Sequence, residues 1–547
     1  MTFSTLDFAV FGGYCLLIIL IGVYVSREKR GHHKTASDYF LASKALPFWA
    51  VGASLIASNI SAEQFIGMAG SGFALGLAIS AYEWIAAITL VLVGIFFLPI
   101  YLKEGIFTMP QFLNRRYDNR VRTVMAVFWL LVYVFVNLTS VLYLGALSIE
   151  TILGIPMVYS IIGLSLFAMI YSIYGGLKAV AWTDVVQVVF LVMGGLATTY
   201  LALSLVGSGS VLEGIAVLGR EAPSHLQMIF EKGEFMIPDG RGAMRDAYLD
   251  LPGLSVLVGG MWIVQFSYWG CNQYITQRAL AARDLDNAQK GMIFAGFIKL
   301  LMPIIVVVPG IAAYVIVEKG ASPEFIGTMT DASTHIIKSD RAYPALLQLL
   351  PQGLKGLAFA ALTAAIVSSL ASMANSTATI FTIDIYKQFI NPKATDRQQV
   401  EMGRLVAIAA FFIAAIVAPA LRVLDQAFQY IQEYTGFVSP GVTAIFVFGF
   451  FWKKTTSNAA LAAACLTIPL SAALKAVYPA LPFIDRMGIV FMLLSALMVL
   501  ISLVENRGKV NDNAISLEKG LFRTSMGFNI GAILICGITA ALYVVFW

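Results

Sequence analysis

Two charged residues lie inside apolar segments of this chain, where a charge is costly. Glu83 belongs to SAYEWIAAIT and Lys299 to FAGFIKLLMP. A carboxylate in hydrocarbon is unfavourable by several kcal/mol unless it is paired or hydrogen-bonded. Lys299 is the natural partner of Glu83, either directly or through a bound ligand, and a purely structural ion pair is the alternative. The pair therefore predicts either ligand binding or a structural link between two segments.

The stretch ASLIASNISAEQFIGMAGSG, residues 53–72, is too polar for an ordinary membrane helix and too apolar for a surface loop. Small residues alone allow close helix packing, but the amide and carboxyl side chains in this stretch need another explanation, and we expect a broken helix. Wherever the backbone is helical, spacings of three and four place four residues on one face: Ala57, Ile60, Gln64 and Met68. Glu63 lies on a different face of this helix. Its position is equally compatible with a structural pairing to a neighbouring helix and with direct ligand contact.

A possible ion site follows from the segment AALTAAIVSSLASMANS. Ala365, Ser368 and Ser369 stand at positions i, i+3 and i+4 and so share a helix face. Serine hydroxyls in membrane helices usually donate to a backbone carbonyl in the preceding turn, so this pattern alone is weak evidence for an ion site. Beside carbonyls freed by a break near Ala57 and Ile60, however, two hydroxyls would complete a neutral cage of oxygens. Such a cage suits a monovalent hard cation, whereas calcium usually requires several carboxylates.

Aromatic residues provide a possible surface for a ligand. Phe428 and Gln432 are four residues apart in DQAFQYIQEYTG, and SYWG contains Tyr268 and Trp269. Aromatic faces beside amides, a carboxylate and an ammonium suit a neutral ligand rich in hydroxyls. Bulky aromatics in membrane spans also pack against lipid, so each of these residues taken alone is ambiguous.

The composition indicates a polytopic membrane protein that must hold these residues in place. Hydrophobic residues make up 59% of the 547 positions and charged residues 12%. Apolar runs long enough to cross a bilayer core of roughly 30 Å predict fourteen transmembrane helices. They are expected at 6–26, 47–74, 78–101, 121–149, 154–176, 179–207, 251–275, 288–317, 350–385, 402–420, 424–452, 457–478, 484–504 and 526–547.

Lysine and arginine residues predict the orientation in the membrane. With the N-terminus outside, the basic connections, such as those containing Arg115, Arg116, Lys453 and Lys454, fall on the cytoplasmic side. An even number of spans then leaves both termini outside a cell membrane. The four cysteines have unrelated spacings, and the four histidines lie in connections, so neither a disulfide framework nor an intramembrane metal site is indicated.

The order of the spans indicates a repeat. Five spans fall between 47 and 207 and five more between 251 and 452, and an odd-numbered unit repeated in series enters the membrane in the opposite direction. The first span of each unit, at 53–72 and 265–278, is the polar one, as expected for a transport site at the midplane. We therefore predict five parts: an N-terminal helix with its linker at 1–45, a first repeat at 46–207, an external loop at 208–250, a second repeat at 251–455 and C-terminal flanking helices at 456–547.

Several long motifs closely resemble the solute:sodium symporter family, and in particular its sodium/galactose and sodium/glucose cotransporters. They include ASLIASNISAEQFIGMAGSG, YSIYGGLKAVAWTDVVQ, YWGCNQYITQR, AAIVSSLASMANSTATIFTIDIYK and FQYIQEYTGFVSPG, and the resemblance extends over nearly the whole chain. It implies an all-α integral membrane protein with a LeuT-type core of two inverted five-helix repeats, working by alternating access.

The same resemblance implies a role for each matching residue. Sodium would be bound by Ala57, Ile60, Ala365, Ser368 and Ser369, and Asp184 would help it leave inward. The sugar would contact Gln64, Glu83, Gln265, Tyr268, Lys299 and Gln432, with Tyr268 stacked beneath the ring and held by Asn59. The gating residues would be Asn59, Met68, Tyr82 and Phe428. Ala86 replaces an expected serine and Gln265 an expected asparagine, which leaves the choice of hexose open.

We therefore expect a monomeric or weakly associated transporter in the cell membrane that couples sodium entry to uptake of galactose or glucose. A sodium symporter for sialic acid, proline or an inositol is the nearest alternative, and Glu83 disfavours an anionic substrate. A channel or sensor on the same fold is a further alternative. A channel needs an open row of ion sites, whereas bulky Tyr268 and Phe428 on either side of one pocket favour a gated transporter. The spans contain no nucleophile and base pair, so an enzyme is not expected.

Overall fold

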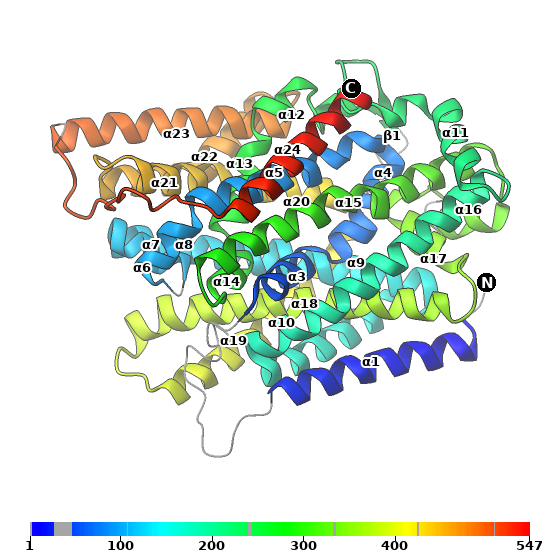
Figure 1. The fold of residues 1–547 in the computed structure, drawn as a ribbon, viewed down its shortest axis with the longest axis horizontal. Helices are drawn as coiled ribbons and strands as arrows, with labels where there is room; N and C mark the ends of the chain where they lie inside the picture. Colours follow the sequence, from blue (N-terminus) through cyan, green and yellow to red (C-terminus); the bar gives the residue numbers. More distant parts are fainter. Residues whose placement is uncertain are drawn as a thin grey trace.

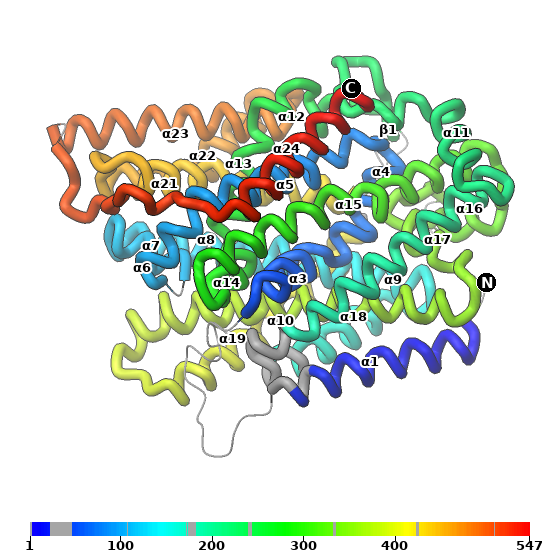
Figure 2. The backbone as a smooth tube through the Cα atoms, in the orientation of Figure 1, coloured from blue at the N-terminus to red at the C-terminus, as the bar shows by residue number. Residues whose placement is uncertain are grey.

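The computed structural model describes residues 3–26, 46–106, 108–238, 243–331, 335–423, 426–507 and 509–547, which are predominantly helical. Most of the long helices run side by side along the long axis of the molecule (Figure 1), and the backbone trace shows how the chain passes repeatedly between its two ends (Figure 2). The helices of the first half are α1 (Thr5–Ser26), α3 (Phe48–Asn59), α4 (Ala69–Leu75), α5 (Ala81–Phe96), α6 (Leu98–Glu104), α7 (Met109–Arg116), α8 (Asn119–Leu131), α9 (Thr139–Leu153), α10 (Met157–Val206) and α11 (Val211–Glu221).

Shorter elements separate these helices from those of the second half. The latter are α12 (Leu254–Val258), α13 (Met261–Cys271), α14 (Gln273–Leu280), α15 (Leu285–Glu318), α16 (Pro323–Met329), α17 (Ala342–Gln348), α18 (Leu354–Ile380), α19 (Asp396–Val417), α20 (Ala427–Thr435), α21 (Ser439–Phe451), α22 (Ser457–Val477), α23 (Phe483–Asn506) and α24 (Met526–Val545). The π-helical segments are η2 (Glu63–Met68), η4 (Val132–Leu138) and η8 (Phe381–Ile390). The 3₁₀ segments are η3 (Gly76–Ser80), η5 (Pro223–Leu226), η6 (Ala247–Leu249), η7 (Ser339–Arg341) and η9 (Ala418–Val423), and β1 (Met236–Pro238) pairs antiparallel with β2 (Met244–Asp246).

The described residues contain nine helices that are long and apolar enough to cross a membrane, or up to eleven if each bent pair counts as one span. The bent pairs are Ala247–Val258 with Met261–Cys271, at 74°, and Ala427–Thr435 with Ser439–Phe451, at 46°. Shorter apolar helices occur at Thr5–Ile21 and Met157–Ile170. The chain is therefore a multi-pass membrane protein. The predicted number of fourteen is higher, because broken and short segments were each expected to form a span.

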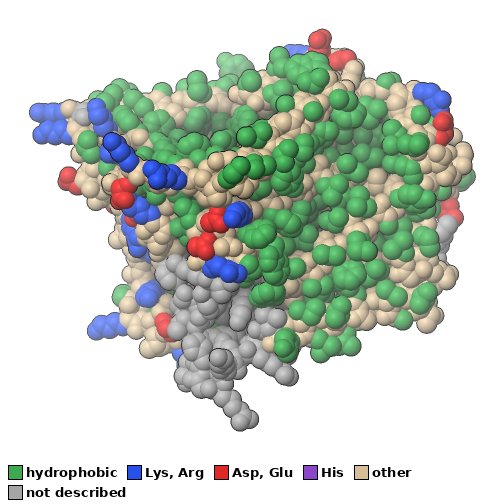
Figure 3. Space-filling model, viewed as in Figure 1, with side chains coloured by type: hydrophobic (Ala, Val, Ile, Leu, Met, Phe, Trp, Pro, Cys, Tyr) green, Lys and Arg blue, Asp and Glu red, His purple; other side chains and the backbone are tan. Residues whose placement is uncertain are grey.

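The surface matches this environment. Hydrophobic side chains cover much of the middle of the face shown in Figure 3, whereas lysine and arginine side chains gather at one end. Lys453 and Lys454 follow α21, and Arg507 follows α23, which places basic residues at that end. Both chain termini are in the opposite half of the molecule (Figure 1).

The predicted break in the polar stretch 53–72 is present. The helix α3 ends at Asn59, and Ile60 has an extended backbone with φ −76° and ψ 100°. Side chains replace helical hydrogen bonds here, because Ser61 N donates to Gln64 Oε1 at 3.2 Å and Glu63 N donates to Ser61 Oγ at 3.2 Å. The chain then continues as the π-helix η2.

A matching break occurs in the polar segment 265–278. The helix α13 ends at Cys271, Asn272 is extended with φ −91° and ψ 126°, and α14 begins at Gln273. Each of the two polar segments thus contains one interruption. Such breaks free backbone polar groups, and these are tolerated at membrane depth only where protein or a cavity surrounds them.

Four elements enclose the region between the breaks. The long helix α15 packs against α3, α4 and α5, and α18 packs against α3 and against α14, which follows the second break. Nearly every side chain of α18 is buried, which its many alanine and serine residues permit because small residues let helices approach closely. The core around the breaks is therefore built from α3, α5, α15 and α18.

The predicted connection 208–250 forms a cap of α11, η5 and the β1–β2 hairpin at the end away from the basic residues (Figure 1). His225 anchors it: the ring stacks on Tyr314 with centroids 3.9 Å apart, and Nε2 lies 3.1 Å from the Phe73 carbonyl. Gly76 makes this contact possible, since its φ is +70° and a Cβ there would lie 2.3 Å from the His225 carbonyl oxygen.

Candidate transport site

Lys299 forms the centre of a buried polar network. Its Nζ donates to Glu83 Oε2 at 2.6 Å, and it also donates to Asn59 Oδ1. The same ammonium lies 5.1 Å from the centroid of the Trp269 ring. Both members of the ion pair are almost completely buried, with side-chain exposures of 1% and 3%. The predicted pairing of Lys299 with Glu83 is confirmed as a direct contact between α15 and α5.

The network continues from Lys299 to the second helix break. Asn59 Nδ2 donates to the Tyr268 hydroxyl at 2.9 Å, and the Tyr268 and Tyr274 hydroxyls are 2.5 Å apart. The contact between Asn59 and Tyr268 agrees with the resemblance, whereas Tyr274 was not predicted. Because Asn59 ends α3 and Tyr268 precedes the break at Asn272, one set of hydrogen bonds links the two interrupted segments.

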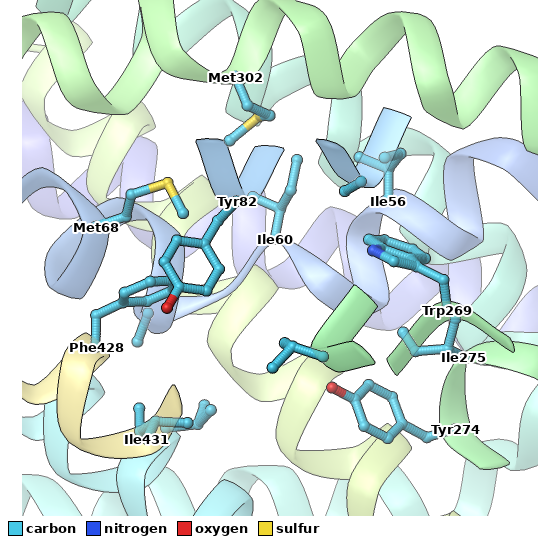
Figure 4. Packing of buried hydrophobic residues seen from close by; sticks show 14 of the residues in the cluster. Ile56, Ile60, Met68, Tyr82, Trp269, Tyr274, Ile275, Met302, Phe428 and Ile431 are labelled. Atoms are coloured by element: carbon cyan, nitrogen blue, oxygen red, sulfur yellow. The ribbon is translucent and has the colours of Figure 1, made fainter. Parts of the chain in front are cut away.

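Aromatic and thioether side chains lie to one side of this network. The rings of Tyr82 and Phe428 pack edge to face with centroids 5.2 Å apart, and Figure 4 shows Met68 beside them, on the opposite side of Ile60 from Trp269. Met68, Tyr82 and Phe428 are all buried. The three residues predicted to gate the site from outside are therefore brought together.

The glutamines differ in their surroundings. The Gln64 amide oxygen accepts a hydrogen bond at the break, as described above. Gln265 Nε2 donates to the Tyr82 carbonyl at 2.7 Å, and its Oε1 accepts from Trp269 Nε1 at 3.0 Å, so the amide links α13 to Tyr82 on α5. Gln432 lines a cavity with Tyr268. Ala86 is buried on α5, three residues after Glu83.

Two of the predicted ion ligands, Ala57 on α3 and Ser369 on α18, are in contact. Ser369 Oγ lies 3.4 Å from the Ala57 carbonyl and 3.4 Å from the Ser58 carbonyl. Ser61 N, the amide that would pair with the Ala57 carbonyl in an unbroken helix, donates to Gln64 instead. Ile60 and Ala365 are buried in the same two segments. The arrangement brings a carbonyl freed by the break to a hydroxyl, as a cage of neutral oxygens requires.

Asp184 lies beside these residues. Ser368 Oγ donates to Asp184 Oδ1 at 2.5 Å, and Ser54 Oγ donates to Asp184 Oδ2 at 2.7 Å. Asp184 thus links α10 to α3 and α18 and contacts a predicted ion ligand directly, although sequence analysis gave it a role only in ion exit. Ser54 was not predicted. Ser54 precedes Ala57 by three residues and so lies on the same helix face. This spacing is the feature of the sequence that could have indicated it.

A buried cation next to these residues was also missed. Arg278, on α14 just after the second break, is fully buried and donates to Ser372 Oγ at 2.5 Å. The predicted span 251–275 ended three residues before Arg278, although the polar segment 265–278 extended to it. The structure instead packs this segment against α3 and α18.

Two interrupted helices that meet at a buried polar network, inside a multi-pass bundle, define a membrane transporter rather than an enzyme. The family model of the sodium:solute symporter family matches residues 39–466. The chain belongs to the sodium:solute symporter family.

Individual relatives agree with this membership. The chain is 51% identical over 552 residues to a sodium/glucose cotransporter of Vibrio parahaemolyticus, and the match covers 100% of this chain and 98% of that protein. It is 34% identical to the sodium/myo-inositol cotransporter 2 of Mus musculus, with 85% of this chain and 69% of that protein covered. The solved structure of a Na⁺-coupled sialic acid symporter, in a substrate-bound outward-open state, has the same fold, with a TM-score of 0.75, 23% identity, and coverage of 92% of this chain and 98% of that one.

Proposed function

We propose that this protein couples the inward flow of Na⁺ to the uptake of a neutral hexose, glucose or galactose. The observation that carries the proposal is the direct pairing of Lys299 and Glu83 beside the two helix breaks. The opposite charges of the pair cancel, so the pair can offer charge-assisted hydrogen bonds to a ligand without a net charge of its own. The relative from Vibrio parahaemolyticus, named a sodium/glucose cotransporter, supports a hexose as that ligand.

We assign the sugar to the region between Tyr268 and the outer gate of Met68, Tyr82 and Phe428. Gln64, Glu83, Lys299 and Gln432 would bind its hydroxyls, and Gln265 would act through Tyr82 and Trp269. The sodium ion would be held by the carbonyls of Ala57, Ile60 and Ala365 and the hydroxyls of Ser368 and Ser369. Support comes from the contact of Ser369 with the Ala57 carbonyl at the end of α3.

We infer fourteen spans, with two inverted repeats at 46–207 and 251–455 between the N-terminal segment 1–45 and the flanking helices 456–547. The loop 208–250 would cap the outside, and both termini would face outward from the cell membrane. The matching breaks at Ile60 and Asn272 support the repeat, and the basic residues gathered at one end support the orientation.

One sodium ion per sugar suffices for concentrative uptake. A potential near 100 mV supplies about 2.3 kcal/mol per charge. A tenfold sodium gradient adds about 1.4 kcal/mol, and together they support accumulation of several hundredfold.

Uptake into proteoliposomes tests the proposal. Purified protein should accumulate labelled glucose or galactose when external Na⁺ is present, and replacement of Na⁺ by K⁺ should abolish accumulation. Unlabelled galactose, glucose, myo-inositol and sialic acid added as competitors would identify the preferred solute. The second candidate is myo-inositol, because a relative with that printed name also matches most of the chain. Strong competition by sialic acid alone would contradict a neutral substrate.

A further inference from the structure

Glu63 is a buried carboxylate that the proposed sites do not use. It is 4% exposed, and its Oε1 has no hydrogen-bond partner among the residues that the structure describes. A buried polar oxygen left without a hydrogen-bond partner is unfavourable by about 1–3 kcal/mol. Its position in the π-helix η2, directly after the break at Ile60, is one where such segments are often functional. This group therefore needs a ligand.

The cavity in front of Glu63 is lined by groups that both donate and accept hydrogen bonds. Polar residues from η4, α20 and α21 surround it, together with the extended residue at the second break: Tyr133, Asn137, Gln432, Ser439 and Asn272. In the described part of the chain, its lining includes neither lysine nor arginine. A carboxylate among neutral amides and hydroxyls suits a neutral polyhydroxylated ligand, since each hydroxyl can donate to the acid and accept from the amides.

The position of the cavity relates it to the proposed transport route. Tyr268 lines it and also accepts from Asn59, which contacts Lys299. Along α20 and α21, the lining begins at Ile431 and Gln432, after the gate residue Phe428, and continues to Val442. It therefore extends toward the basic end of the molecule, which we assign to the cytoplasm.

We propose that Glu63 forms a second, inward-facing sugar subsite, which binds hydroxyls of the neutral hexose as it passes Tyr268 toward the cytoplasm. This inference rests on the proposed function. Glu63 would lower the barrier to release by replacing hydrogen bonds that the sugar loses when it leaves Lys299 and Glu83. The carboxylate would then be paired during transport and unpaired between cycles.

The first test distinguishes an effect on sugar binding at the external side from an effect on sugar release to the cytoplasm. Glu63→Gln keeps the size of the side chain but loses the charge-assisted bonds, so the maximal rate of sodium-driven glucose uptake should fall by roughly fivefold or more. The apparent KM for external glucose and the dependence on sodium should stay unchanged. Glu505→Gln, on the exposed end of α23, is the matched control. Unchanged maximal rates in Glu63→Gln would overturn the inference.

The second test detects the ligand in the subsite. A Glu63→Cys variant, with the four native cysteines replaced by alanine, should react with a charged thiol reagent in inside-out vesicles. Glucose with sodium should slow this reaction roughly fivefold, whereas labelling of Glu505→Cys should not change. Protection by sodium alone would identify a cation site and overturn the sugar assignment, as would labelling that glucose leaves unchanged. Absence of sodium-driven glucose uptake by the wild type would instead refute the proposed function itself.

Discussion

At the scale of single residues, the centre of the proposed sugar site is the buried ion pair between Lys299 and Glu83. Two charges buried together are stabilised mainly by each other, so the removal of one leaves the other uncompensated. A sugar that inserts its hydroxyls between them can satisfy both charges without water. The pair is therefore expected to be stable when closed and adaptable when a ligand enters.

We expect Glu83→Gln and Lys299→Ala each to weaken sugar binding by about 1–3 kcal/mol, because each removes a charge-assisted hydrogen bond. The double variant should lose less than the sum, since neither single charge is left stranded. Isothermal titration calorimetry with all three proteins measures these changes in the free energy of sugar binding. Wild-type sugar affinity in all three would show that the pair has only a structural role.

Ser369→Ala should abolish or strongly reduce sodium-driven uptake. The hydroxyl lies 3.4 Å from the Ala57 carbonyl, and loss of one oxygen from a small cage weakens ion binding by about 1–3 kcal/mol. Uptake measured against sodium concentration would reveal the shift. Ser376→Ala, seven residues further along the same buried helix, is the matched truncation and should keep the wild-type sodium dependence. Equal behaviour of the two variants would contradict the ion site.

Sequence alone predicted that Glu83 and Lys299 are partners because apolar segments offer few charges to choose from. It did not predict whether they touch, since the two residues are separated by 216 positions and a ligand could bridge them. Ser54 was not predicted for a related reason. Its partner Asp184 is 130 positions away, and one serine in an apolar run usually bonds to its own turn.

At the scale of elements, polar composition predicted which helices are broken, and the structure shows where. Ser61 and Gln64 satisfy backbone groups at the first break, and this local chemistry is visible in the sequence. The second break at Asn272 and the burial of α14 depend on packing against α3 and α18. Such long-range packing has no local pattern, which explains why Arg278 and Tyr274 were missed.

The cap formed by residues 208–250 should loosen in acid. Burial lowers the pKa of His225 to about 4, so the docked ring stays neutral while a released ring takes up a proton below its ordinary pKa of about 6.5. Docking is thus fully favourable above about pH 6.5 and weakens as the pH falls toward 4, by on the order of 2 kcal/mol at pH 5. Hydrogen exchange of residues 211–226 at about pH 7 and pH 5 measures this. Replacement by phenylalanine in His225→Phe keeps the stacking on Tyr314 and should remove the pH dependence; an equal dependence in both proteins would assign it to another group.

At the scale of the whole molecule, the two interrupted segments and the gate cannot act independently. Asn59 belongs to the first segment and Tyr268 to the second, and they are hydrogen-bonded to each other and, through Lys299, to α15 and α5. Tyr82, next to Glu83 on α5, packs on Phe428 of α20. Movement of either segment would therefore rearrange the network and the contact between Tyr82 and Phe428 together, as the proposed alternating access would require.

Holding the outer gate closed should stop transport in both directions. Cysteines introduced by Tyr82→Cys and Phe428→Cys, in a background without native cysteines, replace two rings whose centroids are 5.2 Å apart, so a short thiol cross-linker can join them. Cross-linking should abolish sodium-driven glucose uptake and also glucose exchange across the membrane, and cleavage of the linker should restore both. Each single variant treated with the same reagent controls for the loss of one aromatic ring. Continued uptake by the cross-linked protein would mean that sugar bypasses this gate, and the contact between Tyr82 and Phe428 would then be structural packing.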